Sequence, residues 1–147
     1  DREAVEMFKK VISINPEFYS AYGDLQITYE RLGEIDKYRE TIQAALQVYP
    51  HYLLLHPDDA RAHMYYAITL AQAGKPEDAK TTAAKAIELN PDDPLMLYNA
   101  ACFYARLGEK RLALESLRNS VIAGHEHYEW FKRDPDLDNI RNEPEYV

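Results

Sequence analysis

Apolar side chains recur at helical spacing along most of the chain. Within residues 2–14, Ala4, Phe8, Val11 and Ile12 fall on one face, which is typical of an amphipathic helix. Similar segments follow over residues 17–32, 35–49, 59–73, 76–89, 93–107 and 110–123. Prolines and glycines separate them, and both residues favour the conformations in which helices end. The pattern therefore predicts an all-α fold.

The helical pattern repeats with a period of 34 residues. This separation joins Gly74 to Gly108, Ala79 to Ala113, and Pro57 to Pro91. A fixed period of this length is the signature of a helical solenoid, in which each unit buries its apolar face on its neighbours. The spacing predicts a half repeat at 1–16, repeats at 17–50, 58–91 and 92–125, an insertion at 51–57, and a C-terminal cap at 126–147.

The residues at the repeated positions resemble those of tetratricopeptide repeat (TPR) proteins, whose pattern is W-x2-L-G-x2-Y, then A-x3-F, then P. The repeat at 60–93 has His63, Tyr66, Ala67, Leu70, Ala79, Ala83 and Pro91 at these positions. The repeat from residue 94 has Leu97, Ala100, Ala101, Tyr104, Ala113 and Leu117, with His125 where proline is expected. The resemblance implies a right-handed superhelical solenoid of antiparallel helix pairs with a C-terminal capping helix.

The repeat at 17–50 departs from this pattern. Small residues are expected where paired helices approach most closely, but Gln26 and Tyr38 occupy those positions here. Two bulky residues should push the helices apart or make one swing out. The insertion at 51–57 follows the same repeat, and two interpretations of it stay open. Its leucines cover apolar surface exposed by an altered stack, or the segment is an irregular loop.

The resemblance also implies where a partner binds. TPR arrays resemble one another in holding extended peptides along a face lined by the first helix of each pair. The corresponding positions here are Arg61, Met64, Tyr65, Ile68, Leu95, Tyr98, Asn99, Cys102 and Arg106. Met and Tyr suit adaptable binding surfaces. Equally, these side chains could pack on adjacent helices and leave no groove, because helical spacing alone does not separate the two cases.

Composition narrows the partner class to proteins or peptides. The formal net charge of −8 argues against nucleic acid and anionic membrane as partners. The single cysteine, Cys102, is compatible with a reducing compartment, so we expect a cytoplasmic location. No apolar run approaches the length of a membrane span. Residues 130–146 resemble segments that close repeat arrays in bacterial multidomain TPR proteins, and we interpret the chain as part of a larger bacterial protein.

Candidate catalytic and metal-binding groups are weak. His125 and His127 lie one residue apart without the spacing of a metal site, which favours a solvated loop. Cys102 has no histidine partner at readable spacing, so a buried or groove-lining thiol is favoured over a nucleophile. We find no phosphate loop, nucleophile elbow or dinucleotide fingerprint. The sequence therefore predicts no enzyme activity, cofactor or metal in this chain.

Two functions follow from these observations. The first is a protein-interaction scaffold that binds a peptide or partner surface. The second is self-association, because the half repeat at 1–16 lacks its pairing helix and would leave Phe8 and Val11 exposed. This second function would suit an architectural module of a signalling protein whose catalytic domain lies elsewhere. At the other end, we expect Trp130, Phe131, Leu137 and Ile140 to pack on the last repeat while the acidic residues of the cap face water.

Overall fold

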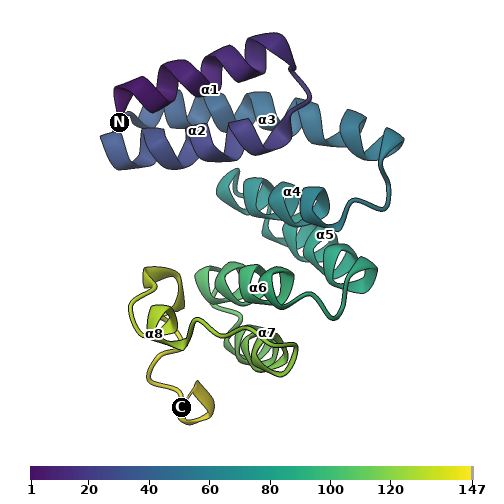
Figure 1. Ribbon diagram of the computed structural model, residues 1–147, viewed down its shortest axis with the longest axis vertical. Helices are drawn as coiled ribbons and strands as arrows, with labels where there is room; N and C mark the ends of the chain where they lie inside the picture. Colours follow the sequence, from purple (N-terminus) through teal and green to yellow (C-terminus); the bar gives the residue numbers. More distant parts are fainter. Residues whose placement is uncertain (147) are drawn as a thin grey trace. The chain divides into compact units, whose positions relative to one another are not determined.

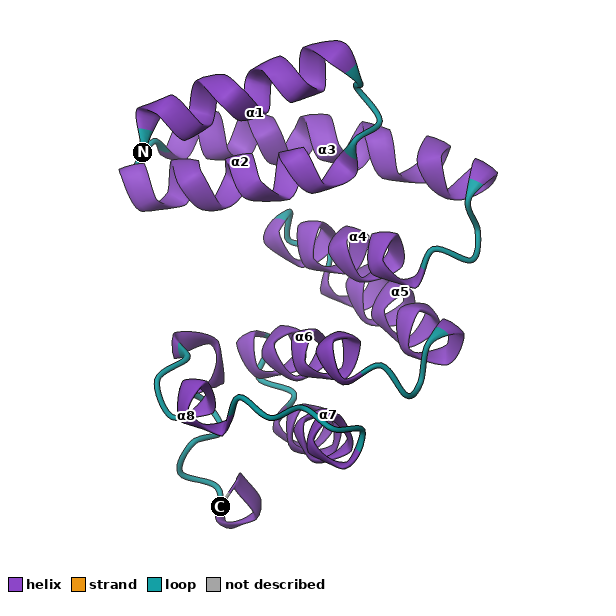
Figure 2. Cartoon of the chain, viewed as in Figure 1, coloured by secondary structure: helices purple, strands orange, loops and turns teal. Residues whose placement is uncertain are grey.

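The chain forms consecutive helices joined by short turns in the computed structural model, which describes residues 1–146 (Figure 1). The α-helices are α1 (Arg2–Ile14), α2 (Tyr19–Leu32), α3 (Ile35–Leu55), α4 (Ala60–Gln72), α5 (Pro76–Leu89), α6 (Pro94–Arg106), α7 (Lys110–Ile122) and α8 (Tyr128–Phe131). Two 3-10 helices follow, η1 (Pro135–Leu137) and η2 (Pro144–Tyr146). Residues 1–146 contain no strand (Figure 2), so the predicted all-α class is confirmed.

The first residues of the helices lie within about two residues of the starts predicted from the sequence. Helix α5 begins at Pro76 and α6 at Pro94, as expected for a residue whose missing N–H costs nothing in the first turn. The N-caps of α4 and α6 are Asp59 and Asp93. The carboxylate of Asp59 accepts from the amide of Ala62 at 3.0 Å, and Asp93 caps α6 in the same way. Each cap satisfies an amide that the helix itself leaves unpaired.

Helix α3 is longer than the sequence predicted. It was expected to end near residue 49, before Pro50, but it continues to Leu55 with Pro50 inside it. A proline inside a helix costs about 3 kcal/mol, so other contacts must stabilise the extension. They come from its tyrosines: Tyr49 is buried, and Tyr52 contacts the ring of Tyr19. The segment at 51–57 is thus mostly helical rather than an irregular loop.

Two of the three leucines of this extension do not cover apolar surface, whereas Leu53 is partly buried. Leu54 is 80% exposed and Leu55 is 63% exposed. The preceding helix pair has also stayed in contact, since α2 packs on α3. Gln26 is buried between them, and Tyr38 packs against the cluster around Leu25. Neither helix has therefore swung out of contact with the other, and Tyr38 lies in the cluster that α1 shares with α2.

The chain divides into two compact units, residues 1–82 and 83–147, which are described separately. In the first unit α2 packs between α1 and α3, and α4 packs on α3. Val5, Leu25 and Tyr29 form one buried cluster. Tyr22, Ala45 and Tyr49 form a second.

Asp59 joins the end of α3 to the start of α4 in the first unit. Besides capping α4, its carboxylate accepts hydrogen bonds from the hydroxyls of Tyr52 at 2.7 Å and Tyr19 at 3.3 Å. Burial alone would raise the pKa of this carboxyl, but the bonds from Tyr52, the Ala62 amide and Tyr19 outweigh it and lower the pKa below its usual value. The hydrogen bond to Asp59 in turn raises the pKa of Tyr52 to about 12.

In the second unit α6 packs closely on α7. Ala101 and Ala113 are fully buried, as expected where paired helices approach most closely. Gly108 ends the turn between the helices with φ 78°, a left-handed conformation that glycine adopts without strain. The hydroxyl of Ser120 donates to the carbonyl of Pro94 at 2.7 Å and fixes the end of α7 beside the start of α6.

The C-terminal residues pack on this helix pair. Phe131, Leu137 and Ile140 are buried, as the sequence indicated, and η1 contacts α6. Trp130 differs from the expectation because it is 53% exposed. Asp134 differs too: it was expected to face water and is buried. The acidic residues of the C-terminal segment therefore do not all lie on its outer surface, because Asp134 is buried.

Replacing Ala101 with Leu should destabilise the protein by about 1–3 kcal/mol, because the added carbons have no space at a fully buried helix contact. Urea unfolding monitored by circular dichroism measures the change. Ala84→Leu is the matched control, since Ala84 is an exposed helical alanine, and its effect should stay within about 0.5 kcal/mol. Equal effects of the two substitutions would contradict this packing.

Replacing Tyr52 with Phe should destabilise the protein by about 1 kcal/mol at neutral pH, because one hydrogen bond to the Asp59 carboxylate is lost. The folded-state pKa of Asp59 is lowered, so its stabilisation is present above the unfolded pKa near 4 and is lost as pH falls through the folded value. The difference between wild type and variant should therefore shrink between about pH 5 and pH 2. Urea unfolding at several pH values tests this. Tyr128→Phe, which alters a half-exposed ring, is the control, and a difference independent of pH would contradict the role of Asp59.

Candidate functional site

Helix α6 carries one stripe of side chains that divides into an open and a covered part. Leu95 and Asn99 lie at the start of the stripe, and Tyr98, Cys102 and Arg106 follow at intervals of one turn. Leu95 is 52% exposed, whereas Tyr98 and Cys102 are buried. All five residues were predicted to face a partner, but the structure leaves only the beginning of the stripe and the Arg106 side chain accessible.

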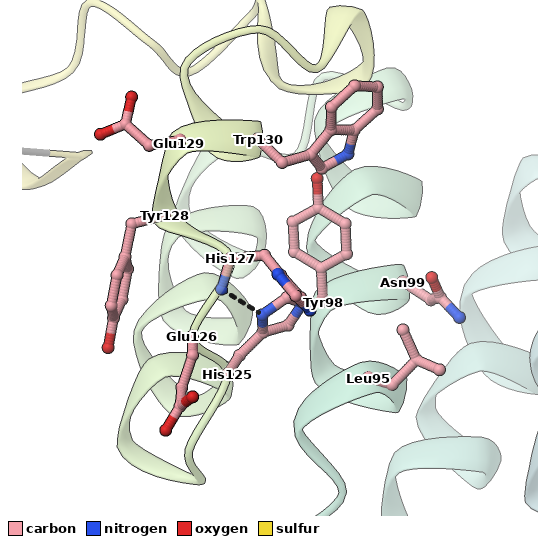
Figure 3. Close-up of a pocket in the computed structure, with 9 residues that line it drawn as sticks. All are labelled: Leu95, Tyr98, Asn99, His125, Glu126, His127, Tyr128, Glu129 and Trp130. Atoms are coloured by element: carbon pink, nitrogen blue, oxygen red, sulfur yellow. Dashed lines mark hydrogen bonds between the residues drawn. The ribbon is translucent and has the colours of Figure 1, made fainter.

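The open part forms one wall of a pocket of about 690 Å³. Leu95, Tyr98 and Asn99 line it from α6, and residues 125–130 line it from the opposite side. Figure 3 shows the two walls, with Leu95 and Asn99 on the α6 helix and the histidines between them and the outer residues of the C-terminal segment. The pocket combines aliphatic, aromatic and imidazole groups with two carboxylates, and no lysine or arginine lines it.

His125 closes the base of this pocket. Its ring lies 4.9 Å from the ring of Tyr98 and 5.1 Å from that of Phe131, measured between centroids. The amide of His127 donates to His125 Nδ1 at 3.3 Å (Figure 3). Burial, with a smaller contribution from His127, lowers the pKa of His125, so the ring is neutral at physiological pH. The pair was expected to form a solvated loop, and His125 instead packs among aromatic rings.

The covered part of the stripe is bonded to Asp134. Its Oδ2 accepts hydrogen bonds from the Tyr98 hydroxyl, from Trp130 Nε1 at 3.1 Å and from Cys102 Sγ at 3.7 Å. One turn further along, Arg106 Nε pairs with Asp136 at 3.2 Å. These contacts explain why side chains predicted to line a groove are buried.

The environment of Cys102 makes it a poor nucleophile. Burial, followed by the charges of Asp134 and Asp136, raises the pKa of the thiol to about 12. The thiolate, which is the reactive form, is therefore almost unpopulated at neutral pH. This agrees with the interpretation of Cys102 as a buried thiol.

Cys102, Asp134 and Asp136 also bring three potential metal ligands within 4.8 Å of one another. Their donor atoms already have partners, since Asp134 accepts from Tyr98 and Trp130 and Asp136 pairs with Arg106. A metal ion would have to displace these groups and deprotonate a thiol whose pKa is raised. The cluster is better suited to hold the C-terminal segment than to hold an ion.

The four predicted site residues on α4 lie in the first unit. Arg61 is exposed, Ile68 and Tyr65 are partly buried, and Met64 is fully buried. The ring of Tyr65 packs on Tyr19, with centroids 5.8 Å apart. Met64 and Tyr65 thus take part mainly in packing, which was the alternative interpretation of the same spacing.

Sequence reasoning missed the second wall of the pocket. Residues 125–130 were interpreted as linker and cap, although their density of aromatic and imidazole groups is visible in the sequence. Their position opposite α6 follows from the contact of Asp134 with Tyr98, which are 36 residues apart, and no local pattern signals it. None of the helices in the described part of the chain combines the length and hydrophobicity needed to cross a bilayer.

Comparison with known proteins agrees with this architecture. Residues 38–101 match the family described as tetratricopeptide repeat. A thermophilic TPR protein of Thermus thermophilus, TTC0263, shares the fold with a TM-score of 0.66 and 20% identity, covering 88% of this chain and 68% of that one.

Two further solved structures are similar at a lower level. MamA has a TM-score of 0.47 and 16% identity over 81% of this chain and 85% of its own. YrrB, described as a TPR protein with an unusual peptide-binding site, has a TM-score of 0.47 and 18% identity over 86% of this chain and 79% of its own. No curated protein matches the sequence. Residues 38–101 are thus similar to tetratricopeptide repeats, and most of the chain shares its fold with the Thermus protein.

Proposed function

We propose that the chain is a protein-interaction module that binds a peptide or a partner's surface at the pocket between α6 and residues 125–130. The observation that carries the proposal is the exposure of large apolar side chains around a formed pocket. Leu95, Tyr128 and Trp130 are each about half exposed there. Tryptophan and tyrosine anchors of this kind contribute most of the binding energy in many interfaces.

Other properties support an interaction role over catalysis or nucleic-acid binding. TPR repeats serve as scaffolds for protein–protein interaction, which is consistent with the family match. The net charge of −8 is unfavourable for contact with phosphate backbones. The buried free thiol of Cys102 suits a reducing compartment, and we place the protein in the cytoplasm as part of this proposal.

Self-association is a second candidate because α1 presents apolar side chains to solvent. Met7 is 59% exposed and Ile14 is 75% exposed, while Phe8 and Val11, which were expected to be exposed, are partly buried. Side chains of this size on one helix suit packing against a second copy of the chain.

Leu95→Asp should weaken peptide binding about tenfold or more, because it places a charge in an apolar part of the pocket. Ligands would first be selected from a random peptide library displayed on phage, and their affinities measured by fluorescence anisotropy. Leu54→Asp, at an exposed leucine of α3, is the matched control and should bind as wild type does. Both variants should melt near the wild-type temperature. Failure to select any peptide, or equal loss in both variants, would contradict the proposed site.

The double variant Met7→Ser/Ile14→Ser distinguishes the second candidate. If α1 mediates self-association, sedimentation at high protein concentration should give a wild-type mass above that of a monomer and a monomeric variant. The substituted side chains are exposed, so the variant should remain folded. A monomeric wild type would exclude self-association through α1.

A further inference from the structure

The C-terminal segment, residues 126–146, lies on α6 as a bound peptide would. Its contacts are spread along the helix. Asp134 meets Tyr98 and Cys102, and Asp136 meets Arg106 one turn later. The side chain of Asn139 then donates to the carbonyl of Ala105 at 2.9 Å. The two hydrogen bonds of Asp134 join residues 36 and 32 positions apart, so local chain geometry does not impose them.

The surroundings of Asp134, formed jointly by α6 and by the segment itself, fit a carboxylate and reject its amide. One oxygen, Oδ2, accepts from Tyr98, Cys102 and Trp130, and the other, Oδ1, accepts from the backbone amide of Asp136 at 3.0 Å. The N–H groups of Trp130 and Asp136 are donors only. An asparagine would direct its own N–H₂ group at one of these two donors in either orientation, so only a carboxylate satisfies both.

The segment is shaped for this contact by bonds within itself. Arg141 donates to the carbonyl of Asp134 at 2.8 Å and to that of Phe131 at 3.3 Å. Asp134 also caps η1, and Leu137 is fully buried. A ligand whose bound conformation is held by internal bonds loses less entropy on binding. The segment therefore has the properties of a preorganised acidic peptide.

We propose that the covered part of α6 is a recognition surface for acidic segments, that residues 126–146 occupy it as an intrachain ligand, and that a partner segment with the same chemistry binds by displacing them. The partner presents one aspartate to Tyr98 and Cys102 and a second acid, two residues later, to Arg106. This inference rests on the proposed function, since it names the partner class for the same helix face.

The covalent link sets how strongly the resident segment competes. Only a few residues separate the end of α7 at Ile122 from the start of the segment, and a short tether gives an effective concentration on the order of millimolar. A free peptide binds the intact chain only if its concentration and affinity are high enough to displace the resident segment. Weakening the resident segment should therefore expose the surface and raise the affinity for an added peptide.

A synthetic peptide of residues 126–146 is the probe, added to the full chain and followed by fluorescence anisotropy. The full-length variant Asp134→Ala/Leu137→Ala weakens the resident segment. We expect this variant to bind the peptide about tenfold or more tightly than the wild-type chain does. A peptide with Asp134→Asn should bind the variant about tenfold or more weakly than the unaltered peptide. A peptide with Asn142→Ala, which alters an exposed side chain outside the pocket, is the control and should bind as the unaltered peptide does.

Hydrogen exchange of the wild-type chain provides a measurement that needs no substitution. Amides of residues 128–140 should exchange about tenfold or more faster than those of α6 and α7, because the segment opens without unfolding the helix pair. Equal protection would overturn the inference, as would a folded variant that does not bind the peptide or a wild-type chain that binds it equally well.

If the inference fails in this way while library peptides still depend on Leu95, the proposed function stands. If no library peptide is found but the segment peptide binds the variant, the covered part of α6 is supported as a surface for acidic segments. The open pocket is then not a binding site for a partner.

Discussion

Each helix of this chain can bury its apolar face only against another helix, and this constraint governs both units. Apart from α3, the helices are short, and isolated helices of such length are marginal in water. Apolar side chains are buried well only where two helices approach closely, so small residues occupy these helix contacts. Four alanines are fully buried there: Ala100, Ala101, Ala105 and Ala113. The stability of α6 is thus a property of its contacts rather than of its own sequence.

The same constraint applies to the face of α6 that α7 leaves uncovered. At the C-terminal end, Phe131, Leu137 and Ile140 supply apolar cover. Apolar contacts alone are non-directional, whereas the hydrogen bonds of Asp134 fix the position of the segment along α6. In α1, by contrast, Ile14 is largely exposed.

Much of this architecture could be predicted because it depends on local rules repeated at a fixed spacing. The period of 34 residues located the helices, and the positions of Pro76 and Pro94 located two of their starts. The extension of α3 through Pro50 could not be predicted, since it depends on contacts of Tyr49 and Tyr52 with residues distant in sequence. For the same reason, the sequence could not show which of the predicted site residues on α6 are buried. Tyr98 and Cys102 were placed on the correct stripe, but a carboxylate more than 30 residues away decides whether that stripe is open.

The division of the α6 stripe has a physical consequence for any partner. Its open end offers apolar side chains around Leu95, where binding depends mainly on desolvating aromatic and aliphatic surface. Its covered end offers neutral donors to a buried carboxylate and a guanidinium at Arg106, where binding depends on matching charged groups. Tyr98 belongs to both, because its ring lines the pocket and its hydroxyl binds Asp134. A ligand that moved this ring would also disturb the hydrogen bond to Asp134, because the proposed pocket and the proposed acidic surface share this side chain.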